Sequence, residues 1–396
     1  MLPSQQPLRE WLFREAEATC RLYGYRGIQT PVFEHTELFE RTSGAGSDIV
    51  QKEMYTFRDR ADRALTLRPE ATAPTARAYV EHGLHREPQP VKTFTIGPMF
   101  RYAAPQRGRY REFWQLNVEA MGSDDPAVDA ELIQLYTELL RRLGIAGWTL
   151  ELNSIGDRNC RPAYLERLDR WLDEHSADLD DEARQKRSTS PLRVFDTKSP
   201  RVRRALAAAP KIGESLCAEC RAHFEAVRGY LDGFGIRYEL MPTLVRGLDY
   251  YTRTTFEVVG EALGAQDSLC GGGRYDYLIE EIGGRPTPAV GWASGIERTL
   301  ISLEEAGAAR EDEGVEIFFA FDARERREEV LPLLAELRRE GRAADTDYAA
   351  RSLKGQLTQA QRSGARTTVI VGKDSFTIRR AGEQDREVAS LDLEQL

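Results

Sequence analysis

Residues 244–251 read LVRGLDYY, and residues 268–276 read SLCGGGRYD. In the first stretch, the glycine at position 247 permits a tight turn after Arg246, and two adjacent tyrosines open an extended run over residues 254–259. In the second stretch, three consecutive glycines would let a ligand approach bare backbone. Either stretch alone is equally compatible with a glycine-rich hairpin turn beside a buried strand. The two stretches together, in this order, are more specific, and an interpretation of them must agree with the rest of the sequence.

The composition is that of an ordinary globular chain. It has 396 residues, of which 41% are hydrophobic and 30% charged, which predicts two to three domains. No apolar run approaches the roughly 20 residues of a membrane span, and the N-terminus lacks a basic-then-apolar signal pattern. We therefore expect a cytoplasmic protein that makes no membrane contact. The formal charge of −9 excludes a uniformly basic nucleic-acid binder but allows a local basic groove.

The five cysteines are widely spread and odd in number, which argues against a disulfide framework and fits reduced thiols in the cytosol. The nearest approach to a metal motif is Cys217-x-x-Cys220, with His223 following, and Cys160 could supply a fourth ligand in space. The sequence contains no second CxxC or HxxxH pair of the kind that completes a zinc site. We therefore favour buried helical cysteines and predict no metal site.

The first third of the chain alternates between predicted helices and strands. Apolar spacing predicts a helix over residues 7–23, which Gly24 ends. A strand is predicted over residues 28–33, at a sheet edge or bulge because Pro31 cannot donate to a ladder. Residues 65–67 form a half-buried strand, and Glu70 follows it. This carboxylate is placed either to meet an ammonium group or, as a surface acid, to favour a helix start.

A predicted hairpin follows, with strands over residues 91–101 and 114–122. Gln115, Asn117 and Glu119 share one face of its return strand. With Arg101 and Arg109 on or near the connecting loop, this hairpin is suited to bind a polyanion together with a polar small molecule. An amphipathic helix is predicted over residues 126–143 and a strand over residues 148–153.

The remaining chain divides into three parts. Residues 157–235 are highly charged and helical, as in an insertion. Residues 287–298 predict a strand entering a helix that carries Arg298, and residues 303–314 a polar linker. Strands alternating with helices over residues 315–396 predict a small α/β domain. Neither a P-loop nor a GxGxxG before a helix occurs, which excludes Walker-type and Rossmann enzymes.

These segments together resemble the histidyl-tRNA synthetase family from about residue 7 to the end. The two glycine-containing stretches resemble its histidine-specific signatures, and the helix–strand start, the hairpin and the Arg298 segment resemble motifs 1, 2 and 3 of class II synthetases. The resemblance implies an α+β fold: a mainly antiparallel sheet flanked by helices, formed by residues 1–156 and 236–302. It also implies a helical insertion over 157–235, an anticodon-binding domain over 315–396, and a homodimer.

The resemblance further implies a reaction in which ATP and L-histidine form histidyl-adenylate with Mg²⁺, followed by transfer of histidine to tRNA(His). Arg101 and Arg246 would meet the carboxylate and the α-phosphate, as the catalytic residues, and Arg109 and Arg298 would hold the outer phosphates of ATP. The implied histidine-binding residues are Glu70, Thr72 and Gln115 for the amino group, Glu119 and Tyr251 for the imidazole, Arg246 for the carboxylate, and Tyr250.

Three features depart from the family pattern: a short N-terminus, Ala103 and Ala104 at positions where motif 2 carries an acid and an arginine, and Tyr277 after the second signature. The alternative function is a non-catalytic regulatory subunit of ATP phosphoribosyltransferase, which also resembles these synthetases. Such subunits lack the anticodon domain and do not need the ATP-binding arginines. The segment from residue 315 and the presence of Arg101, Arg246 and Arg298 favour the synthetase.

Overall fold

The structure is a computed structural model that describes residues 2–42, 44, 47, 49–197, 199–260, 268–309 and 314–396. The chain divides into two units, one of residues 9–309 and one of residues 310–396 together with residues 1–8. Within the described residues, no helix is both long enough and apolar enough to cross a membrane.

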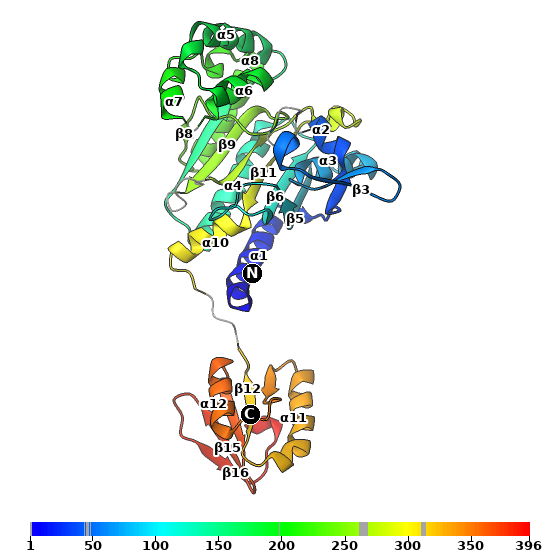
Figure 1. Cartoon of the computed structure of the whole chain (residues 1–396), viewed down its shortest axis with the longest axis vertical. Helices are drawn as coiled ribbons and strands as arrows, with labels where there is room; N and C mark the ends of the chain where they lie inside the picture. The colour runs from blue at the N-terminus through cyan, green and yellow to red at the C-terminus, as the bar shows by residue number, and fades with distance from the viewer. Residues whose placement is uncertain are drawn as a thin grey trace. The chain divides into compact units, whose positions relative to one another are not determined.

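The larger unit is built on an eight-stranded sheet in the order β1-β5-β6-β11-β10-β9-β7-β8 (Figure 1). Its strands are β1 (Arg26–Gly27), β5 (Val91–Phe100), β6 (Glu112–Met121), β7 (Trp148–Ser154), β8 (Glu239–Leu240), β9 (Thr252–Gly260), β10 (Ser268–Arg274) and β11 (Ala289–Gly295). Neighbouring strands are antiparallel except for the two edge pairs, β1 with β5 and β7 with β8. A three-stranded sheet consists of β2 (Phe33–His35), β4 (Ala64–Leu67) and β3 (Tyr55–Arg58).

One face of the large sheet carries helix α4 (Pro126–Leu143). Trp292 of β11 lies on this face, where its indole Nε1 donates to the Leu132 carbonyl at 3.0 Å and its ring meets Tyr136 edge-on. Because side chains alternate along a strand, the neighbours of Trp292 in β11 point to the opposite face. The larger unit also contains α1 (Gln6–Leu22), α2 (Thr36–Thr42), α3 (Thr72–Glu81), α9 (Leu278–Glu281) and α10 (Ile296–Glu305).

The insertion forms a group of helices beyond one end of the large sheet, the green region of Figure 1. These are α5 (Arg161–Glu174), α6 (Asp181–Thr189), α7 (Pro200–Leu206) and α8 (Ala218–Gly233). The insertion does not have an isolated core. Tyr164, Leu168 and Leu172 belong to the same buried cluster as Tyr250 and Tyr275. The insertion is therefore packed onto the segment that carries the two signatures.

The smaller unit has a five-stranded sheet in the order β13-β12-β14-β15-β16. Its elements are β12 (Ile317–Phe321), α11 (Arg327–Arg339), β13 (Ala344–Thr346), α12 (Leu353–Arg362), β14 (Thr367–Val371), β15 (Phe376–Arg380) and β16 (Arg386–Val388). Strands β13, β12 and β14 are parallel to one another. Strand β15 is antiparallel to β14, and β16 is antiparallel to β15. The predicted α/β character is confirmed.

Two predicted elements are wrong. Residues 28–32 are not a strand; β1 ends before them and β2 begins at Phe33. Proline 31 interrupts the pairing there, so the chain forms short strands in two different sheets. The predicted linker begins too early, because α10 continues to Glu305. Residues 310–313 of that linker lie outside the described residues.

Candidate functional site

The face of the large sheet opposite α4 carries the predicted row of polar side chains. Gln115, Asn117 and Glu119 of β6 are buried on it. Their register partners on β11 are all small: Gly295, Ala293 and Gly291, respectively. Because directly paired residues of antiparallel strands point to the same face, these small residues leave open space beside the polar row.

Two glycines on this face of the large sheet make room for charged groups. A Cβ atom on Gly291 would collide with the carboxylate of Glu119, and a Cβ atom on Gly271 would collide with the guanidinium of Arg246. The glycine run therefore provides the space that the Arg246 guanidinium occupies. It is also part of strand β10, so a glycine-rich hairpin turn is the wrong interpretation of these residues.

Glu119 is the centre of a buried hydrogen-bond network. Its Oε1 accepts from the Thr72 hydroxyl at 2.7 Å and its Oε2 from the Tyr275 hydroxyl at 2.5 Å. Burial raises the pKa of Glu119 to about 8, although both hydroxyl donors act to lower it. The carboxyl group therefore holds a proton near neutral pH, and each oxygen keeps a lone pair for a further partner.

Glu70 lies at the start of α3, where its carboxylate accepts from the backbone N–H of Thr72 at 2.6 Å and of Ala73 at 3.0 Å. The helix-start interpretation is correct in position, but this acid is buried and not on the surface. Burial raises the pKa of Glu70, and the backbone donors partly offset this effect.

One tyrosine of the first signature, Tyr250, contacts a second tyrosine from each signature. Tyr250 and Tyr251 have ring centroids 4.7 Å apart, and Tyr250 meets Tyr275 edge-on at 5.7 Å. All three are buried. Since Tyr275 binds Glu119, this aromatic group connects the LVRGLDYY segment to the end of the polar row.

Four arginines surround the outer part of the site. Arg246 pairs with Glu257 at 3.0 Å, and Arg101 Nε donates to the Pro69 carbonyl at 2.8 Å. Both arginines are thereby fixed by other parts of the large unit, and each keeps N–H groups for an anion.

The remaining two arginines lie on the hairpin loop and on α10. Arg109 pairs with Glu53 at 2.6 Å. Arg298 donates to the carbonyls of Gly108 at 3.2 Å and Ser268 at 2.8 Å. Arg298 therefore ties the hairpin loop to the first residue of β10.

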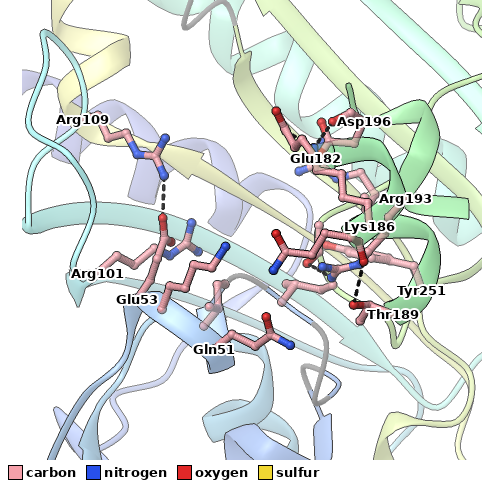
Figure 2. A pocket seen from close by; sticks show the side chains of 16 residues that line it. Gln51, Glu53, Arg101, Arg109, Glu182, Lys186, Thr189, Arg193, Asp196 and Tyr251 are labelled. Carbon is pink, nitrogen blue, oxygen red and sulfur yellow. Dashed lines mark hydrogen bonds and ion pairs between the residues drawn. The ribbon is translucent and has the colours of Figure 1, made fainter. Parts of the chain in front are cut away.

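A cavity of about 430 Å³ opens beside these groups. Of the ten predicted site residues, Arg101, Arg109, Arg246 and Tyr251 line it. Figure 2 shows Arg101 and Arg109 beside Glu53, with Lys186 and Arg193 of the insertion across from them. Six lysines and arginines line the cavity against three acids, so it attracts anions.

Several buried polar atoms on the site face have no hydrogen-bond partner among the described residues. They include the Gln115 Oε1 and both side-chain atoms of Asn117. Buried polar groups are normally paired, so unpaired ones on an open sheet face indicate the place of a polar ligand. This observation is independent of the charge of the cavity.

The sequence interpretation missed some of the residues at the site. Tyr275 was within a quoted signature and Asn117 within the polar row, so both carried a signal. Arg193 of the insertion did not, yet it donates to the Gly247 carbonyl at 2.6 Å and to Asp249 at 3.2 Å. The insertion thus holds the first signature loop directly.

Arg274 of the second signature and the two alanines of the hairpin loop differ in their burial. Arg274, which follows the glycine run, is fully buried and pairs with Asp129 of α4. Ala103, one of the departures in the hairpin loop, has a buried side chain, whereas Ala104 beside it is exposed.

The fold and site together are those of a class II aminoacyl-tRNA synthetase: a large, mainly antiparallel sheet flanked by helices, arginines around a cationic cavity, and a separate C-terminal sheet domain. The family model for histidyl-tRNA synthetases matches residues 1–299. The chain belongs to the histidyl-tRNA synthetase family.

Relatives and a solved structure agree with this assignment over most of the chain. Histidine--tRNA ligase of Desulforudis audaxviator is 50% identical over 92% of this chain and 86% of its own, and that of Desulforamulus reducens is 46% identical over 95% and 90%. The crystal structure of apo S. aureus histidyl-tRNA synthetase superposes with a TM-score of 0.82 at 34% identity, covering 98% of this chain and 95% of its own.

Proposed function

We propose that this protein activates L-histidine with ATP and transfers the histidyl group to tRNA(His). The observation that carries the proposal is the buried network of Glu119, Thr72 and Tyr275 at one end of an unpaired polar row, next to a cavity lined by arginines. The network matches the needs of an imidazole ring, and the arginines match those of phosphates.

Glu119 would recognise the ring through a shared proton. Burial raises the pKa of its carboxyl group to about 8. An entering imidazole is a base, and a proton that moves from the Glu119 carboxyl to a ring nitrogen would leave a carboxylate paired with an imidazolium. The tyrosine and threonine hydroxyls on Glu119 stabilise that charge, and Tyr251 would meet the other ring nitrogen.

The amino and carboxylate groups of histidine would lie toward the arginines. The ammonium group of histidine would be bound by Glu70, Thr72 and Gln115. Glu70 is a buried acid, and the Gln115 Oε1 lacks a partner among the described residues. Tyr250 would pack against the substrate beside them. Such placement converts a bimolecular attack on ATP into a step between held groups.

Charge on the α-phosphate grows as the histidine carboxylate attacks it. Arg246 and Arg101 would stabilise this charge, and Arg109 and Arg298 would hold the outer phosphates. For Mg²⁺, the carboxylate of Glu53 supplies a hard oxygen donor at the arginine end of the site, which fits an ion held mainly by phosphates. When bound, Mg²⁺ would neutralise phosphate charge.

The C-terminal unit would bind the anticodon arm, and the protein would act as a cytoplasmic homodimer. The support for the first point is the independent sheet over residues 317–388, together with four basic residues on or next to α12: Arg351, Lys354, Arg362 and Arg366. A reducing compartment is supported by the five cysteines, all of which are free.

Histidine-dependent exchange between ATP and pyrophosphate on the purified protein tests the proposal. We expect exchange that requires both histidine and Mg²⁺ and that other amino acids do not support. A regulatory subunit of ATP phosphoribosyltransferase would bind histidine but give no exchange, so binding without exchange would favour that alternative.

Replacing Glu119 by glutamine is expected to raise the KM for histidine by about 5- to 150-fold and to leave the KM for ATP nearly unchanged. An amide cannot become an anion, so the charge-assisted bond to the ring is lost, at a cost of about 1–3 kcal/mol. Both constants are measured by pyrophosphate exchange. Equal changes in the two constants would contradict a contact between Glu119 and the ring.

The same variant should alter how stability depends on pH. The Glu119 pKa is about 8 in the folded protein against a usual 4.5, so between these values the folded state binds more protons than the unfolded state. The wild type should therefore lose stability relative to Glu119→Gln as the pH rises from 4.5 to 8, by at most about 1.4 kcal/mol per pH unit. Thermal melts of both proteins at pH 5 and pH 8.5, without ligands, measure the difference. A constant difference in Tm would contradict the raised pKa.

A further inference from the structure

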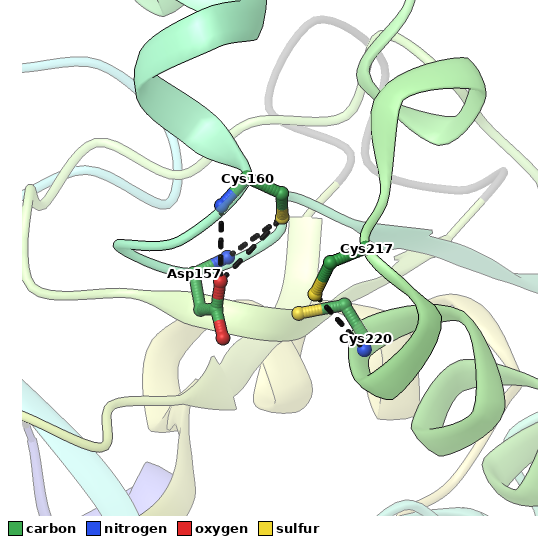
Figure 3. A group of neighbouring side chains, drawn as sticks. All are labelled: Asp157, Cys160, Cys217 and Cys220. Carbon is green, nitrogen blue, oxygen red and sulfur yellow. Dashed lines mark hydrogen bonds between the residues drawn. The ribbon is translucent and has the colours of Figure 1, made fainter.

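Four side chains of the insertion lie close together (Figure 3), and none of them lines the 430 Å³ cavity. They are Asp157 and Cys160, between β7 and α5, and Cys217 and Cys220, at the start of α8. One carboxylate oxygen and three sulfur atoms lie within 4.8 Å of one another. Residues close to 60 positions apart in the sequence therefore form a single cluster.

The distances suit a tetrahedral ion. Bonds of about 2.3 Å to sulfur give a spacing of roughly 3.8 Å between ligand atoms, so the longest edge of the present cluster would contract by about 1 Å. The backbone at residue 156 already lies close to one of the ligand atoms, Cys160 Sγ. Gly156 has φ of +62°, and a Cβ atom on it would lie 2.7 Å from Cys160 Sγ.

Both pairs of ligands follow the same local pattern, a D-x-x-C or C-x-x-C segment that opens a helix. Backbone N–H groups point at the ligand atoms: Cys220 N–H at Cys217 Sγ, and Asp157 N–H at Cys160 Sγ, both at 3.5 Å. The Asn159 N–H donates to Asp157 Oδ1 at 2.9 Å. These contacts orient the ligands.

The donor set selects among metals. Three thiols and one carboxylate form a soft set that suits Zn²⁺ and not Mg²⁺ or Ca²⁺. His223, which follows the CxxC, is outside the cluster; its Nε2 lies 3.9 Å from Asp129. With three thiolates, one carboxylate and Zn²⁺ the group would be negative, and Arg253 supplies a positive charge 3.9 Å from Asp157 Oδ2.

We propose that Asp157, Cys160, Cys217 and Cys220 bind a structural Zn²⁺ ion that joins the first residues of the insertion to the start of α8. This reverses the expectation of no metal site. The sequence contains no second CxxC pair, because the partner of Cys160 is an aspartate, Asp157. The ion would also support the first signature. Arg161, the first residue of α5, donates to the Tyr251 carbonyl at 2.7 Å and the Gly156 carbonyl at 3.0 Å.

The metal content of the full-length wild-type protein is the first test. Purified without chelators, it should contain about one zinc per chain by elemental analysis. After exchange with Co²⁺ it should show thiolate-to-cobalt charge-transfer absorption. Chelation should release the metal and lower the Tm. These measurements do not require a variant to fold.

Variants then identify the ligands. Cys220→Ser and Asp157→Ala should lose most of the zinc, whereas Asp157→Cys should retain it. Cys20→Ser is the matched control, because Cys20 is also free and buried but lies on α1. Its zinc content should be unchanged. A wild-type protein that stays free of zinc after incubation with it, with all five thiols titratable, overturns the proposal, and so does a Cys217–Cys220 disulfide in the purified protein.

Discussion

Replacing Arg246 by alanine should lower the rate of histidine-dependent pyrophosphate exchange by on the order of 10²–10³. The guanidinium is held over Gly271 by Glu257 at 3.0 Å, and it lines the cationic cavity. A donor fixed in this way needs no rearrangement as charge grows on the α-phosphate. The loss should appear in kcat more than in the KM for ATP, because the interaction strengthens in the transition state.

Two control variants separate this effect from damage to the fold. Arg107→Ala removes an exposed arginine of the hairpin loop that pairs with Glu305, and exchange should be nearly normal. Arg246→Ala combined with Glu257→Gln removes the carboxylate left unpaired by the single change. If exchange recovered in the double variant, the stranded charge of Glu257 and not the loss of a catalytic group would explain the defect. Near-normal exchange in Arg246→Ala itself would refute the assignment of this arginine.

Deleting residues 315–396 should abolish most transfer of histidine to tRNA while exchange stays within about a factor of two. The smaller unit has its own sheet and its own buried cluster, including Ile317, Phe319 and Val369, so its removal leaves the core of the large unit intact. The catalytic groups assigned above all lie within residues 9–309. Binding of the anticodon arm would be lost, and every 1.4 kcal/mol of binding free energy that is lost lowers the affinity for tRNA about tenfold.

The measurement compares kcat/KM for tRNA with the exchange rate in the truncated and the full-length protein. Circular dichroism and light scattering establish that the truncated protein is folded and give its oligomeric state. Loss of exchange in a folded protein of unchanged oligomeric state would contradict the proposed division of labour. Unchanged kcat/KM for tRNA would show that the C-terminal unit does not contribute to tRNA binding.

Much of the fold could be predicted because its signals are local. The helix predicted over residues 126–143 is α4 at the same residues, since its apolar stripe and flanking Asp125 and Gly144 act within the segment itself. The polar row of β6 also follows from alternation along one strand. The prediction over residues 28–33 was wrong because pairing of a short segment around Pro31 depends on which sheet each end meets, and residue patterns do not carry that information.

The sequence was sufficient for the polar row and the signature residues, because each is encoded in a contiguous stretch. It was sufficient for the class of fold through the resemblance of its segments to a known family. The tertiary structure was needed for contacts between distant segments. It placed Tyr275 on Glu119, Arg193 of the insertion on the Gly247 carbonyl, and Asp157 among three cysteines. The first two contacts join residues more than 50 positions apart, and Asp157 lies at least 60 positions from Cys217 and Cys220. Their proximity results from the packing of strands and helices into one core, which local periodicity does not specify.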